Sequence, residues 1–91
     1  MATLSERNLV ERLRQRDEAA FNEMVHLYAD TVLEHVRLRI ADPAVAADLV
    51  QDVFVSAFRG TEHAPHTSGL FLWLCSIADD QSKRHPAAMS K

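Results

Sequence analysis

The residues that could do chemistry are few, and no glycine-rich phosphate loop accompanies them. Three polar residues, Glu62, His63 and His66, lie close together in the sequence. With Cys75 they could coordinate a zinc ion, which takes nitrogen and sulfur ligands. The same spacing is typical of a polar loop that holds two unrelated histidines. We favour the loop, and we expect no metal, no cofactor and no enzymatic activity.

The single cysteine and the N-terminus bear on where the protein resides. Cys75 cannot form an intramolecular disulfide, and its apolar neighbours Leu74 and Ile77 predict a buried, unreactive thiol. The first residues lack the apolar core of a signal peptide. No apolar run approaches the roughly 20 residues that span a bilayer. We therefore expect a cytoplasmic protein that makes no membrane contact.

Two carboxylates and an amide occupy the polar side of a segment that is otherwise apolar. Asp48 and Asp52 are four residues apart, so on a helix both project from the face that also carries Gln51. Such a face is most often simply solvated. Alternatively, it forms an acidic docking strip for a basic or amide-rich surface of a partner protein.

The one tryptophan leaves a similar choice open. Trp73 in a domain of this size is usually a core residue, but beside a polar loop it could stack on an unpaired base, worth roughly 1–3 kcal/mol. The net charge of −3 gives no basic excess, which argues against strong nucleic-acid binding by the chain alone. Binding that is assisted by a partner is compatible with this charge.

Helices must position these residues, because apolar side chains recur at intervals of three and four. The pattern predicts four helices, over about residues 4–15, 18–40, 43–59 and 69–84. Asp17 and Asp42 are placed to cap the second and third helices, and Gly60 to end the third in a left-handed conformation. Residues 60–69 have no apolar periodicity, which predicts a loop.

A chain of 91 residues forms one domain with a modest core. The expected fold is all-α: a small helical bundle of about four helices. We expect the domain to occupy residues 1–85 and residues 86–91 to form a flexible tail.

Several stretches resemble the extracytoplasmic-function sigma factors of the sigma-70 family. One is Leu9–Phe21, with the sequence LVERLRQRDEAAF. The most recognisable is Asp42–Phe54, DPAVAADLVQDVF, and residues 57–59 follow it as the family pattern requires. Residues 73–78 are similar to the next helix of the family. The resemblance covers about residues 8–85 and identifies the domain as similar to region 2 of a sigma factor.

This resemblance implies a role in transcription initiation. In the family, the helix equivalent to residues 43–59 docks on the clamp helices of the β′ subunit of core RNA polymerase. The residues so implied for polymerase docking are Asp48, Gln51, Asp52 and Phe54. The next loop and helix hold an unstacked base of the non-template strand at the promoter's −10 element, which keeps the DNA open. The candidates so implied for DNA contact are His63, His66, Trp73, Lys83 and Arg84.

Two departures from the family pattern keep a second hypothesis open. Asp79 and Asp80 stand where the family usually has a basic residue and an asparagine, and carboxylates there would repel phosphates. The sequence after His85 is too short for the family's second DNA-binding domain. The alternative function is a protein-interaction module that keeps the fold without reading DNA. Its partner would be an anti-sigma protein or the other piece of a split sigma factor.

Overall fold

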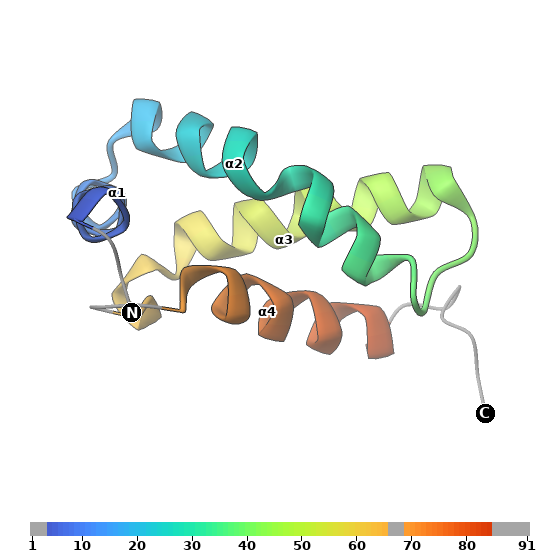
Figure 1. Cartoon of the computed structure of the whole chain (residues 1–91). Helices are drawn as coiled ribbons and strands as arrows, with labels where there is room; N and C mark the ends of the chain where they lie inside the picture. Colours follow the sequence, from blue (N-terminus) through green and yellow to red (C-terminus); the bar gives the residue numbers. More distant parts are fainter. Residues whose placement is uncertain (1–3, 66–68, 85–91) are drawn as a thin grey trace.

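A computed structural model describes the backbone of residues 4–65 and 69–84 and the side chains of residues 7–65 and 69–84. His66, His85 and the predicted tail over 86–91 lie outside the described residues. The described chain forms α1 (Leu4–Arg14), α2 (Glu18–Val36), α3 (Pro43–Arg59), the short 3₁₀ helix η1 (Thr61–His63) and α4 (Leu70–Arg84) (Figure 1). This confirms the predicted all-α bundle.

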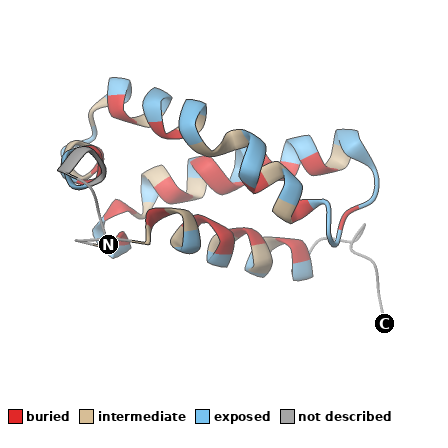
Figure 2. Ribbon diagram, viewed as in Figure 1, coloured by how far each residue is buried: buried red, intermediate tan, exposed pale blue. Residues whose placement is uncertain are grey.

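The three longer helices, α2, α3 and α4, lie side by side, and each packs on the other two. Helix α1 is seen end-on in Figure 1, so it runs across the bundle, where it packs on α2 and η1. The buried faces of α2, α3 and α4 point toward one another (Figure 2). Fully buried side chains come from all four helices, among them Leu13, Met24, Val32, Val53, Leu70 and Leu74.

The predicted starts of α2 and α3 are confirmed by their hydrogen bonds. The Asp17 carboxylate accepts a hydrogen bond from the amide of Ala19 at 2.9 Å. The Asp42 carboxylate accepts one from the amide of Ala44, also at 2.9 Å, and Pro43 begins the helix. Each aspartate thus satisfies a first-turn amide that has no partner inside its own helix.

Helix α2 is shorter than the sequence predicts. It ends at Val36, and residues 37–39 form a turn. In this turn the amides of Arg39 and Ile40 both donate to the Val36 carbonyl, each at 3.0 Å. Ile40 is nevertheless fully buried, because the turn folds it back onto the core. The position of Ile40 in the apolar pattern therefore correctly predicts that the residue is buried. It wrongly predicts that the residue is helical.

The predicted end of α3 is wrong in one respect. Gly60 has a φ of −108° and is not left-handed. Its amide donates to the Ser56 carbonyl at 2.9 Å. The predicted loop after it is partly helical, and Thr61 and Ala64 are both buried there. Among the described residues, positive φ values occur at Arg16 and Gly69.

Three charged side chains fix the corner between α1 and α2. The Arg12 guanidinium lies 2.9 Å from the Asp17 carboxylate and 2.8 Å from that of Glu23. These hydrogen bonds raise the pKa of Arg12, with the bond to Asp17 contributing most. They also lower the pKa of Asp17, because the guanidinium favours the ionised carboxylate.

Acid is expected to destabilise the domain through Asp17. Because the pKa of Asp17 is lower in the folded chain than in the unfolded one, its carboxylate stabilises the fold above about pH 4. This contribution is lost as the pH falls through the folded-state pKa. Asp17→Asn keeps a capping oxygen and removes the charge, so its free energy of unfolding should depend less steeply on pH between about 2 and 4. Urea titrations at several pH values would measure this, and an equal slope in both proteins would contradict it.

A buried hydroxyl in α4 offers a route to a more stable domain. Ser82 is 1% exposed, and its Oγ has no hydrogen-bond partner among the described residues. Ser82→Ala removes this unpaired polar atom and should raise the free energy of unfolding by about 1–2 kcal/mol. The matched control is Ser76→Ala on the exposed side of the same helix, where helix propensity alone should give roughly 0.5 kcal/mol. Equal gains in thermal unfolding would show that the buried hydroxyl is not destabilising.

Candidate functional site

The predicted docking residues of α3 divide into an exposed set and a buried one. Asp48, Gln51 and Asp52 are all exposed on one side of α3, and we call them the acidic strip. Phe54 lies on the other side and is 2% exposed. The strip is therefore available to a partner, whereas Phe54 is chiefly a core residue. A direct docking role for Phe54 stays a prediction.

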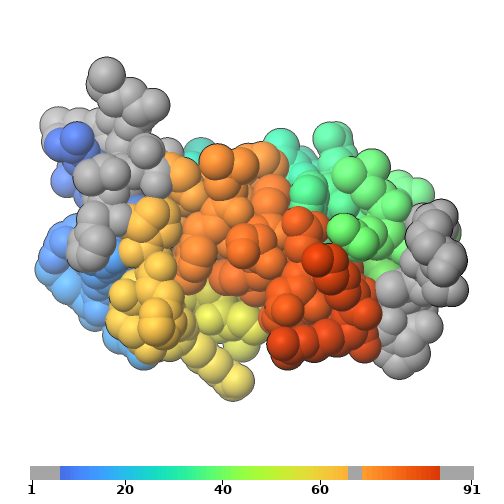
Figure 3. All heavy atoms as spheres, turned by 90° about the horizontal axis from the view of Figure 1, so that it is seen from below, coloured from blue at the N-terminus to red at the C-terminus, as the bar shows by residue number. Residues whose placement is uncertain are grey.

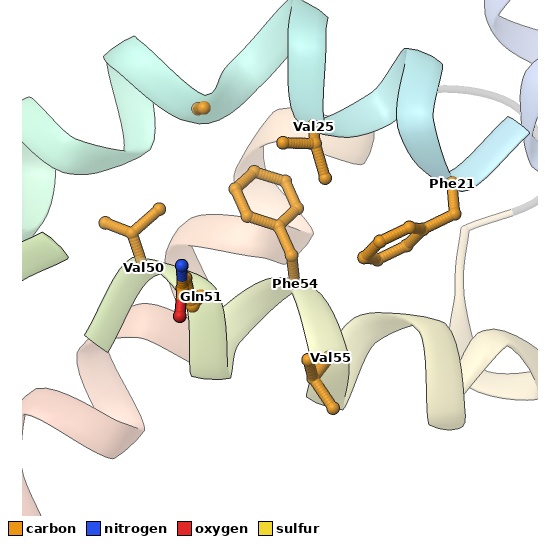
Figure 4. A pocket seen from close by; sticks show the side chains of 7 residues that line it. Phe21, Val25, Val50, Gln51, Phe54 and Val55 are labelled. Carbon is orange, nitrogen blue, oxygen red and sulfur yellow. The ribbon is translucent and has the colours of Figure 1, made fainter. Parts of the chain in front are cut away.

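A groove between α2 and α3 borders the acidic strip. It has a volume of about 400 Å³, and we call it the α2–α3 groove (Figure 4). Its lining is almost wholly apolar and comprises Phe21, Val25, Ala29, Val50, Gln51, Phe54 and Val55. Gln51 belongs to both the groove and the acidic strip, and Val55 is 41% exposed at the groove's edge.

The groove continues along α2 and α3 toward the end of α3. A second hollow shares Phe21 and Val55 with the first and adds Phe58 and Arg59 to its walls. The rings of Phe21 and Phe58 lie 5.1 Å apart between centroids, which suits a tilted aromatic pair. The sequence predicted the apolar stripe of each helix, but not the groove, because it depends on how far apart α2 and α3 lie.

The candidates for DNA contact lie at two separate places on α4. Trp73 is in the first turn, partly buried against the core, and its amide donates to the Gly69 carbonyl at 2.8 Å. Lys83 and Arg84 are exposed at the other end of the helix. Ten residues of helix separate Trp73 from Lys83, a distance of about 15 Å. The structure therefore does not bring them into one pocket.

The remaining candidates belong to the segment that precedes α4. His63 is exposed on η1, with its Nε2 3.7 Å from the Glu62 carboxylate. In Figure 3, the residues of η1 border the beginning of α4, which carries Trp73. His66 lies outside the described residues. Among the described candidates, His63 and Trp73 thus belong to neighbouring elements, η1 and the first turn of α4.

Asp79 is not the free phosphate-repelling carboxylate that the sequence suggests. It accepts a hydrogen bond from Nε2 of His35 at 2.7 Å and lies 3.8 Å from Nε of Arg39. We call these three residues the α2–α4 latch, because they join the end of α2 to α4. Nearby, Gln81 donates to the Ser56 hydroxyl at 2.7 Å and joins α4 to α3. The Asp79 charge is therefore offset within the fold.

Asp80 partly neutralises the charge of Arg84, one of the basic candidates for DNA contact. Its carboxylate lies 3.3 Å from the Arg84 guanidinium, one turn further along α4. Both side chains are largely exposed, so their attraction is weak and is screened by salt.

Asp80→Asn is expected to strengthen DNA binding, because it removes a negative charge and leaves Arg84 available to a phosphate. At low salt the affinity for a single-stranded −10 oligonucleotide should rise by about two- to fivefold. Asp79→Asn is the matched control: it should leave this affinity unchanged while lowering the melting temperature, since it weakens the α2–α4 latch. Fluorescence anisotropy would measure binding in the presence of core polymerase, and equal affinities for wild type and Asp80→Asn would contradict the prediction.

The cysteine and the suggested metal ligands do not form a cluster in the described chain. Cys75 is 7% exposed, as predicted, and burial raises the pKa of its thiol, followed in effect by the charge of Asp79. No group of three potential metal ligands is close enough to hold an ion among residues 7–65 and 69–84. No helix of the described chain is long and apolar enough to cross a membrane.

Curated relatives agree with the resemblance that the sequence indicates. The RNA polymerase sigma-H factor of Pseudomonas aeruginosa is 29% identical over 86 residues, which are 94% of this chain and 45% of the relative. The ECF RNA polymerase sigma-E factors of Haemophilus influenzae and Escherichia coli are each 31% identical over 88 residues, 97% of this chain and 46% of each relative. By sequence, the chain is similar to extracytoplasmic-function sigma factors over slightly less than half of their length.

The similarity to these sigma factors covers only part of each relative. The chain spans slightly less than half the length of the curated sigma factors that it matches. No protein-family model matches the chain. No solved structure gives a significant match.

Proposed function

We propose that this chain is a region 2 domain of a sigma factor, which docks on the β′ clamp helices of core RNA polymerase and contributes to promoter recognition at the −10 element. The observation that carries the proposal is the exposed acidic strip beside the apolar α2–α3 groove. Both are formed by α3, which contains the stretch most similar to the family. Such a function would be exercised in the cytoplasm.

The strip and the groove suit a helical partner that is basic and partly apolar. Carboxylates at Asp48 and Asp52 would orient a basic surface and speed its association. The α2–α3 groove would contribute affinity by removing apolar side chains of both proteins from water. An exposed apolar groove beside charged residues is a typical feature of protein interfaces.

The proposed DNA contact is assigned to η1 and the start of α4. There Trp73 is only partly buried, and His63 is exposed on η1. An aromatic ring can stack on an unpaired base of any type, and binding by stacking does not require a strongly basic surface. Lys83 and Arg84 would at most contact phosphates further along the non-template strand. The net charge of −3 is consistent with DNA binding only after polymerase has docked.

The second candidate function is an interaction module that no longer reads DNA and is bound by an anti-sigma protein or by the other piece of a split sigma factor. The pairing of Arg84 with Asp80 favours it, because this pair reduces the positive charge at the end of α4. The acidic strip and the α2–α3 groove would still serve protein binding in this case.

A labelled single-stranded −10 oligonucleotide separates the two functions. Its anisotropy would be followed with the domain alone, with core polymerase alone, and with both, and a scrambled oligonucleotide is the sequence control. We expect binding that needs both proteins and prefers the −10 sequence. Polymerase docking without any gain in oligonucleotide binding would favour the interaction module. No docking of the folded domain at low salt would reject both sigma-factor functions.

A further inference from the structure

Arg16 lies in the turn between α1 and α2, and its backbone has a conformation that residues other than glycine rarely adopt. Its φ is 63°, a left-handed value that is unfavourable for residues other than glycine. Its guanidinium donates to the carbonyl of Phe58 at 2.9 Å and to that of Arg59 at 3.3 Å. It also lies over the Phe58 ring, 5.6 Å from the centroid.

These contacts explain why the strained turn persists. The last carbonyls of a helix have no partner inside it and need donors from elsewhere. A glycine in the left-handed conformation often ends a helix so that following amides donate to these carbonyls. Gly60 is not left-handed here. The guanidinium of Arg16 instead reaches across from a residue more than forty positions earlier in the chain. The surrounding contacts thus hold Arg16 in its unfavourable conformation.

A second arginine acts on the far side of η1. Arg14, the last residue of α1, donates from Nη2 to the carbonyl of Ala64. Ala64 directly follows η1 and is 3% exposed. Arg16 therefore holds the chain just before η1, and Arg14 holds it just after. The Arg12 ion pairs fix the corner from which both side chains extend.

We infer that Arg14 and Arg16 are positioning residues for base capture. They form an arginine clamp that holds η1, and with it His63, in place beside the start of α4. Helix α1 packs on η1, and its last residue bonds to the chain just after η1, which is the arrangement that the clamp requires. This inference rests on the proposed function, because it assigns to the clamp the geometry of the proposed DNA contact. The two arginines would act through the backbone of η1 and would not touch the DNA.

Three variants separate positioning from charge. Arg16→Gly removes the guanidinium and suits the left-handed turn, and Arg16→Lys keeps the charge but cannot donate as a planar fork. Arg7→Ala removes one positive charge from the exposed side of α1 and leaves the clamp intact. With polymerase bound, Arg16→Gly should weaken binding of the −10 oligonucleotide about tenfold, Arg16→Lys by roughly three- to tenfold, and Arg7→Ala by less than about twofold.

Polymerase docking provides the control for folding, because Arg16 contacts the last two residues of α3, which lie at least six positions beyond the acidic strip. All three variants should pull down core polymerase as wild type does. Wild-type affinity of Arg16→Gly for the oligonucleotide would overturn the clamp. Equal losses in Arg16→Gly and Arg7→Ala would also overturn it, because they would show that charge alone matters. If wild type docks on polymerase but captures no oligonucleotide, the DNA part of the proposed function fails, and the clamp's role in base capture fails with it.

Hydrogen exchange tests the clamp without DNA. The amides of His63 and Ala64 make the hydrogen bonds of η1, to the carbonyls of Gly60 and Thr61. In Arg16→Gly these two amides should exchange at least about tenfold faster, while the amide of Val53 in the core of α3 keeps its rate. The same acceleration at all three amides would show that Arg16 stabilises the whole domain, and unchanged rates would show that it does not hold η1. Either result would overturn the inference.

Discussion

Replacing Asp48 and Asp52 together with lysine is expected to abolish binding to core RNA polymerase. Both carboxylates are exposed on α3 beside the α2–α3 groove, so reversal of their charges would oppose a basic partner surface where wild type attracts it. The fold should survive, because neither side chain is buried. Pull-down of core polymerase and surface plasmon resonance at low salt would measure the loss, and circular dichroism would verify the helices.

The matched control uses a second pair of acidic residues with the same spacing. Asp30 and Glu34 are exposed and four residues apart on α2. Because an α-helix has about 3.6 residues per turn, Asp30 and Glu34 lie on the side of α2 that faces away from Val25 and Ala29. They therefore also face away from the groove. Their replacement by lysine changes the net charge equally but should leave docking within about threefold of wild type. Equal loss in both variants would mean that net charge, and not the acidic strip, governs association.

Phe54→Ala is expected to have the largest effect on stability. The ring is 2% exposed, packed in the core between α2 and α3 and forming part of the groove (Figure 4). Truncation leaves a cavity and should lower the free energy of unfolding by about 3–5 kcal/mol. This is a large share of the roughly 5–14 kcal/mol that is usual for a domain of this length. Thermal and urea unfolding would measure it.

Two comparisons test whether burial sets this loss. Phe21 is only partly buried in the same groove, so Phe21→Ala should cost less than Phe54→Ala. Leu27 is 60% exposed on α2, and Leu27→Ala should change stability by less than about 0.5 kcal/mol. A loss below 1 kcal/mol for Phe54→Ala would show that the groove can collapse around the missing ring.

Local features of the fold were predictable because they depend on neighbouring residues. Asp17 and Asp42 cap the helices that they precede, and both were recognised from residue type and position. The exposure of Asp48 and Asp52 followed from the apolar residues on the opposite side of their helix. The end of α2 was not predictable in the same way, because Ile40 is buried by a turn and still occupies a helical position in the pattern.

Contacts between distant parts of the chain escaped prediction. Asp79 was interpreted from its position in a family pattern, but His35 and Arg39, more than one helix earlier, determine where its carboxylate points. The separation of Trp73 from Lys83 is a matter of helix length, and it could have been calculated once both were assigned to one helix. The α2–α3 groove needed the actual spacing of two helices, which no periodic pattern contains.

The α2–α4 latch limits which substitutions position 79 can accept, in protein design and in evolution. A basic residue at position 79, as the family pattern would have it, would lie close to His35 and Arg39, so a charge that repels Arg39 would replace the carboxylate that now attracts it. We expect such an exchange to cost less stability when position 39 changes with it. The three positions of the α2–α4 latch are therefore coupled. A substitution at one of them changes the electrostatic environment of the other two.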